Sequence, residues 1–227
     1  STLTRGTGVA VCKWPAVALV PGWTGLETLD KRINKRIVIL GGGTAGWIAA
    51  NALVHAWGER GVEVALVESP DIGTVGVGEA TIPTLLTINR LLKIPEPEFI
   101  RETSGTFKLG IQFETWTRRG SRYFHSFGDT GKGCWAGGFQ HFWLRAQRED
   151  LGKPYGEYCL ELKAAEAGKF GLRSDIPLNY AYHLDATSYA ASLRQLAEKD
   201  GVTRVEGRIV EVRQDESGDI SEVVLES

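Results

Sequence analysis

The sequence has no methionine and only three cysteines among its 227 residues. Cys12, Cys134 and Cys159 are odd in number and form no C-x-x-C pair, which argues against a disulfide framework or a zinc site and favours a reducing compartment. The four histidines are scattered without metal-ligand spacing, so no metal site is indicated. Because the chain begins at Ser1 and ends on an apolar strand, we expect part of a longer polypeptide, truncated at its C-terminus.

Long apolar runs and an excess of one charge are also missing. No apolar run approaches the ~18 to 20 residues of a membrane-spanning helix. The net charge of −2 gives no electrostatic reason for binding nucleic acid or an anionic membrane. We therefore expect a cytoplasmic globular protein with neither kind of partner, long enough to bury one sizeable core.

The clearest motif is a glycine-rich turn between a strand and a helix. Residues 37–40 are all apolar and lead into G-x-G-x-x-G at Gly41, Gly43 and Gly46, after which apolar residues recur at helical spacing as far as Gly58. The first glycine permits a tight turn, the second lets a pyrophosphate approach the backbone, and the third lets helix and strand pack closely. The helix N-terminus adds unpaired N–H groups that attract an anion.

A second apolar strand, residues 62–67, ends at Glu68. A carboxylate at this position can accept hydrogen bonds from ribose hydroxyls, and an acid rather than arginine suits the unphosphorylated ribose of FAD or NAD. The pattern predicts a dinucleotide site made by the glycines, Thr44, Ala45 and Glu68. A plain βαβ turn is the alternative, since glycine-rich turns are common.

Residues 106–116 alternate between apolar and polar side chains, which predicts one half-buried strand with Phe107 inside and Lys108 on the polar face. By itself such a lysine is usually solvated.

Residues 121–145 are dense in aromatic side chains, which could form core or line a pocket for an aromatic substrate.

Near the C-terminus the pattern returns to a helix and strands. Asp185 is placed to cap a helix that ends at Gly201. Residues 205–212 and 220–225 follow as two strands, and the turn residues between them predict a hairpin.

Several strings of residues resemble the flavin-dependent tryptophan halogenase family. The glycine loop through Trp47 alone would not separate this family from other flavoproteins. More specific are Gly-Val-Gly-Glu-Ala-Thr-Ile-Pro at 76–83 and Gly-Thr-Phe-Lys at 105–108. The likeness continues through residues 124–128, 141–145 and 183–185, and covers nearly everything from about residue 33 to 227.

The resemblance implies an α/β fold of a particular kind. We expect a Rossmann-like FAD-binding domain of the glutathione reductase or aromatic hydroxylase type over residues 33–227, interrupted by an inserted substrate-region segment at about 69–184. Residues 1–32 have no counterpart in the family pattern and are expected to form a poorly ordered extension.

The resemblance also implies an activity, FADH2-dependent halogenation of an aromatic, indole- or tryptophan-like substrate with halide and O2. A separate flavin reductase supplies the FADH2. The oxidant, hypohalous acid, passes to Lys108, which hydrogen-bonds it or carries it as a haloamine. His125 and Phe127 match the positions that sandwich the substrate ring. Three residues match the family's strap, the segment beside the flavin that connects the cofactor and substrate regions: Gly78, Glu79 and Ala80.

The chain departs from the family pattern in what it omits. The W-x-W-x-I-P signature, the catalytic glutamate and the halide-binding loop lie further along the family's chain than residue 227. Two alternatives therefore stay open. One is a flavin-dependent aromatic monooxygenase, which shares the glycine loop and the terminal acid; the other is an inactive FAD-binding fragment.

Overall fold

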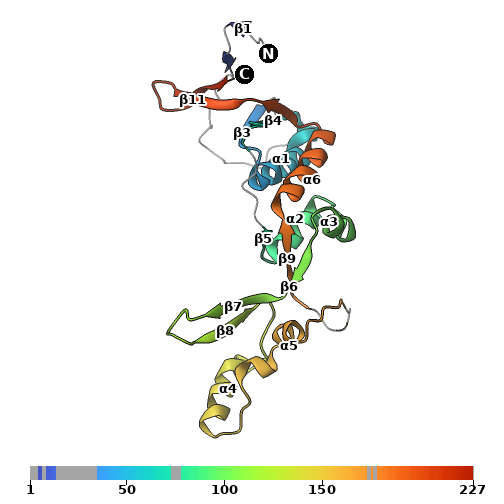
Figure 1. Ribbon diagram of the computed structural model, residues 1–227, viewed down its shortest axis with the longest axis vertical. Coiled ribbons are helices and arrows are strands. Elements are labelled where there is room, and N and C mark those ends of the chain that lie inside the picture. The colour runs from blue at the N-terminus through green and yellow to red at the C-terminus, as the bar shows by residue number, and fades with distance from the viewer. Residues whose placement is uncertain are drawn as a thin grey trace. The chain divides into compact units, whose positions relative to one another are not determined.

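The chain divides into two compact units, Ser1–Val77 with Asp185–Ser227 (unit 1) and Gly78–Leu184 (unit 2). Figure 1 shows the elements of each. The computed structural model describes residues 5–6, 9–13, 35–72, 78–172, 175 and 178–226. No helix within these residues is long and apolar enough to cross a membrane.

Unit 1 is built around a parallel three-stranded sheet in the order β10-β4-β3. Its strands are Thr203–Glu206, Val62–Glu68 and Lys35–Leu40, respectively. The α1 helix (Thr44–Trp57) and the short 3-10 helix η1 (Gly58–Arg60) connect β3 to β4. The predicted strand, glycine turn, helix and second strand are therefore confirmed, and so is the mixed α/β class.

The two faces of this sheet are covered differently. Leu66 is fully buried on the side of α1, and the α6 helix (Ala186–Lys199) packs against α1 in turn. Successive side chains of a strand point to opposite faces, so Val67 contacts the other side, where it clusters with Val223 and Leu225. The helix α6 begins as predicted, since Asp185 accepts a hydrogen bond from the backbone N–H of Thr187 at 2.9 Å.

A second, antiparallel sheet in unit 1 has the order β1-β2-β12-β11. The predicted hairpin is confirmed as β11 (Arg208–Gln214) and β12 (Ile220–Glu226). The expected single strand 205–212 is wrong: it divides at Gly207, because the residues before it pair with β4 and those after it pair with β12.

Within the extension expected over residues 1–32, the structure describes only two short strands. β1 (Arg5–Gly6) pairs with β2 (Val9–Lys13), which in turn pairs with β12. The rest of that segment lies outside the described residues.

Unit 2 contains two small sheets. One has the order β5-β9-β6, and its strands are Gly78–Ala80, Ala181–Asp185 and Thr106–Lys108. The other is a hairpin of β7 (Gly110–Glu114) and β8 (Arg122–Ser126). The expected single strand 106–116 is therefore wrong, since the chain leaves one sheet for the other at Leu109.

The remaining elements of unit 2 are short helices: α2 (Thr84–Leu91), α3 (Glu96–Glu102), α4 (Phe139–Arg148), η2 (Tyr155–Tyr158) and α5 (Leu160–Glu166). No residue of α4 is buried, and Trp135 is 99% exposed. The aromatic residues near α4 pair with one another instead, as Phe139 does with Tyr158 at 5.0 Å between ring centroids.

Candidate active site

The glycine turn of unit 1 leaves the start of α1 open. Gly41 has φ of +115°, a conformation that favours glycine, and its N–H donates to Val67 O at 2.9 Å. A Cβ on Gly46 would lie 2.0 Å from Gly41 O, so only glycine fits there. Gly43, in contrast, faces open space and precedes α1 without a side-chain cap. The first N–H groups of such a helix, beginning with Thr44 and Ala45, have no intrahelical partners and can bind an anion.

Glu68 stands at the end of β4 beside this turn, and it is already engaged. Arg204 Nε donates to Glu68 Oε1 at 2.5 Å, and Trp47 Nε1 donates to Oε2 at 3.3 Å. A Cβ on Gly42 would lie 1.6 Å from Oε2, so the carboxylate packs directly on the turn. These contacts hold the carboxylate next to the glycines and leave it the remaining lone pairs for further donors.

In unit 2, Lys108 is the last residue of β6 and is only 7% exposed. Its Nζ donates to the backbone O of Thr81 at 2.9 Å. Desolvation by burial lowers the pKa of this amine from its ordinary value. The expectation from alternation alone, a solvated lysine, is wrong, because β6 pairs Lys108 with buried Ala181 and brings Thr81 over it.

The structure brings one of the two ring-binding candidates to this lysine. Lys108 Nζ lies 5.3 Å from the centroid of the Phe127 ring, within cation–π range. The Phe127 N–H donates to Leu109 O at 3.1 Å, which fixes this segment against the residue after Lys108. His125 lies two residues earlier in β8 and is exposed; its side chain makes no hydrogen bond within the described part of the chain.

The strap candidates Gly78, Glu79 and Ala80 form β5, which is exposed throughout. The strand leads to Thr81, whose N–H donates to Tyr182 O at 2.9 Å. The strap is thereby joined to the sheet that carries Lys108. Residues 73–77 of the same glycine-rich segment lie outside the described residues.

The sequence analysis missed Glu161, which is buried at 3% exposure in the first turn of α5. Its Oε2 accepts from Ser126 Oγ at 3.4 Å, and its Oε1 accepts from the Asn179 N–H at 3.3 Å. A Cβ on Gly128 would lie 1.8 Å from Oε1. This carboxylate therefore fixes the turn that carries Phe127. The sequence hinted at this contact only through Gly128, which directly follows the Phe-His-Ser-Phe string and leaves space for a neighbouring side chain.

The described residues contain no group of three or more His, Cys, Asp or Glu side chains that could hold a metal ion. What they do contain is a parallel α/β unit with a dinucleotide-type glycine turn and a second unit with a buried lysine under an aromatic ring. The first of these is the arrangement typical of a dinucleotide-binding unit of the α/β class.

Comparison with known proteins narrows that class. Residues 36–227 match the family described as tryptophan halogenase. The chain is 37% identical over 214 residues to tryptophan 7-halogenase RebH of Lentzea aerocolonigenes, an alignment covering 86% of this chain and 40% of the relative. The chain therefore belongs to the tryptophan halogenase family.

Solved structures agree. The flavin-dependent halogenase Xcc4156 from Xanthomonas campestris aligns with a TM-score of 0.79 and 53% identity, over 86% of this chain and 39% of that one. BrvH, a flavin-dependent halogenase from Brevundimonas sp. BAL3, aligns with a TM-score of 0.74 and 38% identity, over 84% and 39%. The chain thus spans about 40% of the length of the relatives it matches.

Proposed function

We propose that this chain carries the cofactor loop and the oxidant-directing lysine of a flavin-dependent halogenase. The observation that supports it most is Lys108, a buried amine bound to Thr81 O beside the Phe127 ring. The reaction proposed is FADH2-dependent halogenation of a tryptophan-like ring with halide and O2, and a separate reductase supplies the FADH2. Relatives named as tryptophan halogenases support this substrate class.

The residues of unit 1 fit an FAD molecule. The open space at Gly43 leaves room for a pyrophosphate against the backbone, and the first N–H groups of α1, at Thr44 to Gly46, have no intrahelical partners. Gly41 provides the turn, and Glu68 is held where it can accept from a ribose hydroxyl. We assign Gly78, Glu79 and Ala80 to the flavin on the family resemblance alone. When bound, reduced FAD would supply two electrons to O2 and halide would supply the other two, so that hypohalous acid and water are formed.

Lys108 performs the next task in this proposal. As an ammonium it donates to the oxygen of hypohalous acid and polarises the O–halogen bond; as a free amine it forms a haloamine. Burial favours the amine form. In either route the ring gains the halogen and loses a proton, and water is released. Phe127 and His125 offer aromatic faces to the substrate ring.

FAD binding is tested first, by following flavin fluorescence as FAD is titrated with the 227-residue chain. Gly43→Leu adds a side chain where nothing of the chain lies within 4 Å, so we expect folding to be kept and FAD binding to be lost. Gly171→Leu, at an equally open glycine of unit 2, is the matched control and should bind normally. Equal binding by both variants would contradict the assignment of the glycine loop.

The role of Lys108 is tested in the protein at its full natural length, supplied with a flavin reductase, bromide and tryptophan. Lys108→Ala should keep FAD binding and flavin oxidation while lowering halogenated product by at least about 100-fold. Lys132→Ala, at an exposed lysine, is the control. Undiminished product from Lys108→Ala would refute the proposed role, and hydroxylated product without halide dependence would favour a monooxygenase.

A further inference from the structure

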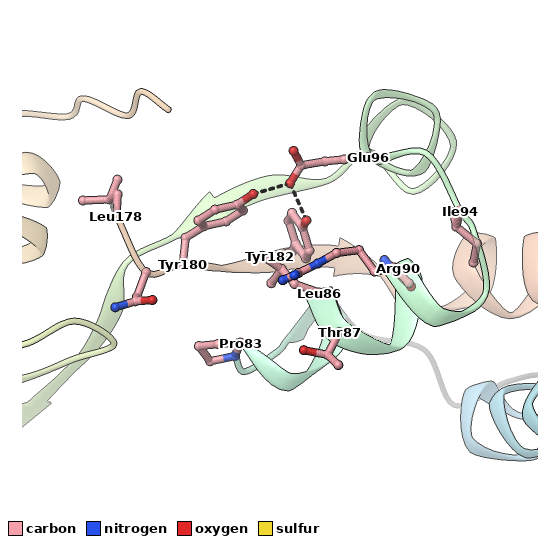
Figure 2. A pocket seen from close by; sticks show the side chains of 11 residues that line it. Pro83, Leu86, Thr87, Arg90, Ile94, Glu96, Leu178, Tyr180 and Tyr182 are labelled. Carbon is pink, nitrogen blue, oxygen red and sulfur yellow. Dashed lines mark hydrogen bonds between the residues drawn. The ribbon is translucent and has the colours of Figure 1, made fainter. Parts of the chain in front are cut away.

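Unit 2 contains a cavity of about 560 Å³ that the proposed halogenation does not use. It lies among α2, the start of α3 and the segment that leads into β9 (Figure 2). Its size falls within the range of small-molecule sites, which is roughly 300 to 1,000 Å³. All of its lining residues are described and belong to this one unit.

The cavity is on the opposite face of the sheet from Lys108. In the β6–β9 pair, Phe107 is opposite Tyr182 and Lys108 is opposite Ala181. Directly opposed residues share a face, and neighbours along a strand point to opposite faces. Tyr182 lines the cavity, so Lys108 and its Phe127 contact lie on the other side of this sheet. The cavity is therefore separate from the candidate active site.

One end of the cavity is negatively charged. The phenol oxygens of Tyr180 and Tyr182 both donate to Glu96 Oε1, at 2.7 and 2.5 Å (Figure 2). Burial, and then the bond to Glu96, raises the pKa of Tyr180 to about 12, so this phenol stays a donor at neutral pH. The two bonds orient the carboxylate and occupy one oxygen. Within the described residues, Oε2 makes no hydrogen bond and can accept one from a ligand.

A positive group faces the same space. Arg90 extends from α2 toward the two tyrosines (Figure 2). Its guanidinium makes no hydrogen bond or ion pair with the described part of the chain, and its positive charge acts on the nearby Tyr180 phenol. Both phenols already donate their protons to Glu96, so neither can donate a hydrogen bond to an anion. A ligand anion in this cavity would therefore bind the fork of Arg90.

We propose that this cavity binds a free α-amino acid with an apolar side chain. Its carboxylate pairs with Arg90, its ammonium group pairs with Glu96 Oε2, and its side chain contacts Leu86, an apolar lining residue one turn before Arg90 on α2. A simple anion would be repelled by Glu96 and a simple cation by Arg90, so a zwitterion is the class that uses both charges. The site does not depend on the role proposed for Lys108.

The test is saturation-transfer NMR on the 227-residue chain with three probes. L-leucine carries both charges, L-leucinamide lacks the carboxylate, and 4-methylpentanoate lacks the ammonium group. We expect saturable binding of L-leucine and at least about tenfold weaker binding of both analogues, because each loses one charged hydrogen-bonded partner. Equal signals from all three probes, or none from L-leucine, would overturn the proposal.

Point variants test whether L-leucine binds in this cavity. Arg90→Gln changes an exposed side chain, so the fold should be kept while L-leucine binding weakens about tenfold. Arg101→Gln, on the exposed face of α3 and outside the cavity, is the matched control and should bind like the parent chain. Glu96→Gln should weaken L-leucine and leave 4-methylpentanoate unchanged or tighter, because the repelling charge is gone. Binding that survives Arg90→Gln would place the amino acid elsewhere and overturn the assignment.

Discussion

The two units bury different kinds of side chain. Among the described residues, the buried core of unit 1 is apolar except for Asn51, whose Nδ2 donates to Trp47 O and Leu193 O at 2.8 Å. Unit 2 buries Lys108 and Glu161 as well as neutral polar groups. Burying a charged group costs free energy unless it is well hydrogen-bonded. Unit 1 is thus organised for stability, whereas unit 2 holds charged groups in fixed places beside the proposed substrate ring.

The largest effect that we expect is from a truncation in the apolar core of unit 1. Leu66→Ala removes a fully buried side chain from the middle of β4 and should lower the free energy of unfolding by about 3 kcal/mol. Urea denaturation measures this. Leu151→Ala, at a 76% exposed leucine of unit 2, should change the value by less than about 0.5 kcal/mol. Similar losses in both variants would mean that the burial of Leu66 does not stabilise the core of unit 1.

The next largest effect tests a buried charge in unit 2. Glu161→Ala leaves the N–H of Asn179 and the hydroxyl of Ser126 without their acceptor and should cost about 2 kcal/mol. Glu161→Gln keeps an acceptor oxygen and should cost less. Amide hydrogen exchange measured by NMR should quicken locally at Asn179 and Gly128 in the alanine variant. Exchange that quickens evenly throughout the chain would show that Glu161 has no particular role at this turn.

The predictable parts of the molecule are those whose determinants are close together in the sequence. The strand, Gly41 turn and α1 follow one another within a short stretch, so hydrophobic periodicity and glycine spacing were enough to predict them. The same is true of Asp185, whose acceptor lies two residues from the N–H that it caps. Local sequence decides these features because local hydrogen bonds and packing form them.

The surroundings of Lys108 could not be predicted in that way. Its partner Thr81 is 27 residues away, and its burial depends on pairing with Ala181 from the far end of the unit. Alternation therefore gave the wrong environment, and only the family resemblance indicated the lysine. Glu161 was missed for the same reason: an acid in the first turn of a short helix is usually a surface residue, and its partners come from distant segments.

A smaller effect is expected at the cap of α6, which returns the chain from unit 2 to unit 1. Asp185→Ala removes the acceptor for the Thr187 N–H and should lower Tm by about 2 to 4 °C. Asp185→Asn keeps an acceptor oxygen and should change Tm much less. The bond to Ser188, then that to Thr187, lowers the pKa of Asp185, so its contribution is present above the ordinary carboxyl pKa and is lost as pH falls through the lowered value. A Tm difference between parent and alanine variant that does not shrink in acid would contradict this.

The smallest effect concerns the charge on Lys108, and it tests the comparison between the units directly. Burial lowers the pKa of this amine below its ordinary 10.5, so the unfolded chain binds its proton more tightly than the folded chain does. As pH rises from the lowered folded value toward 10.5, the cost of burying the ammonium group is relieved. The parent chain should therefore gain stability relative to Lys108→Met in that window. Urea denaturation at several pH values measures the difference, and Lys132→Met, at an exposed lysine, provides the control. A difference that stays constant with pH would mean that water still solvates the Lys108 ammonium, and unit 2 would then bury its lysine at no electrostatic cost.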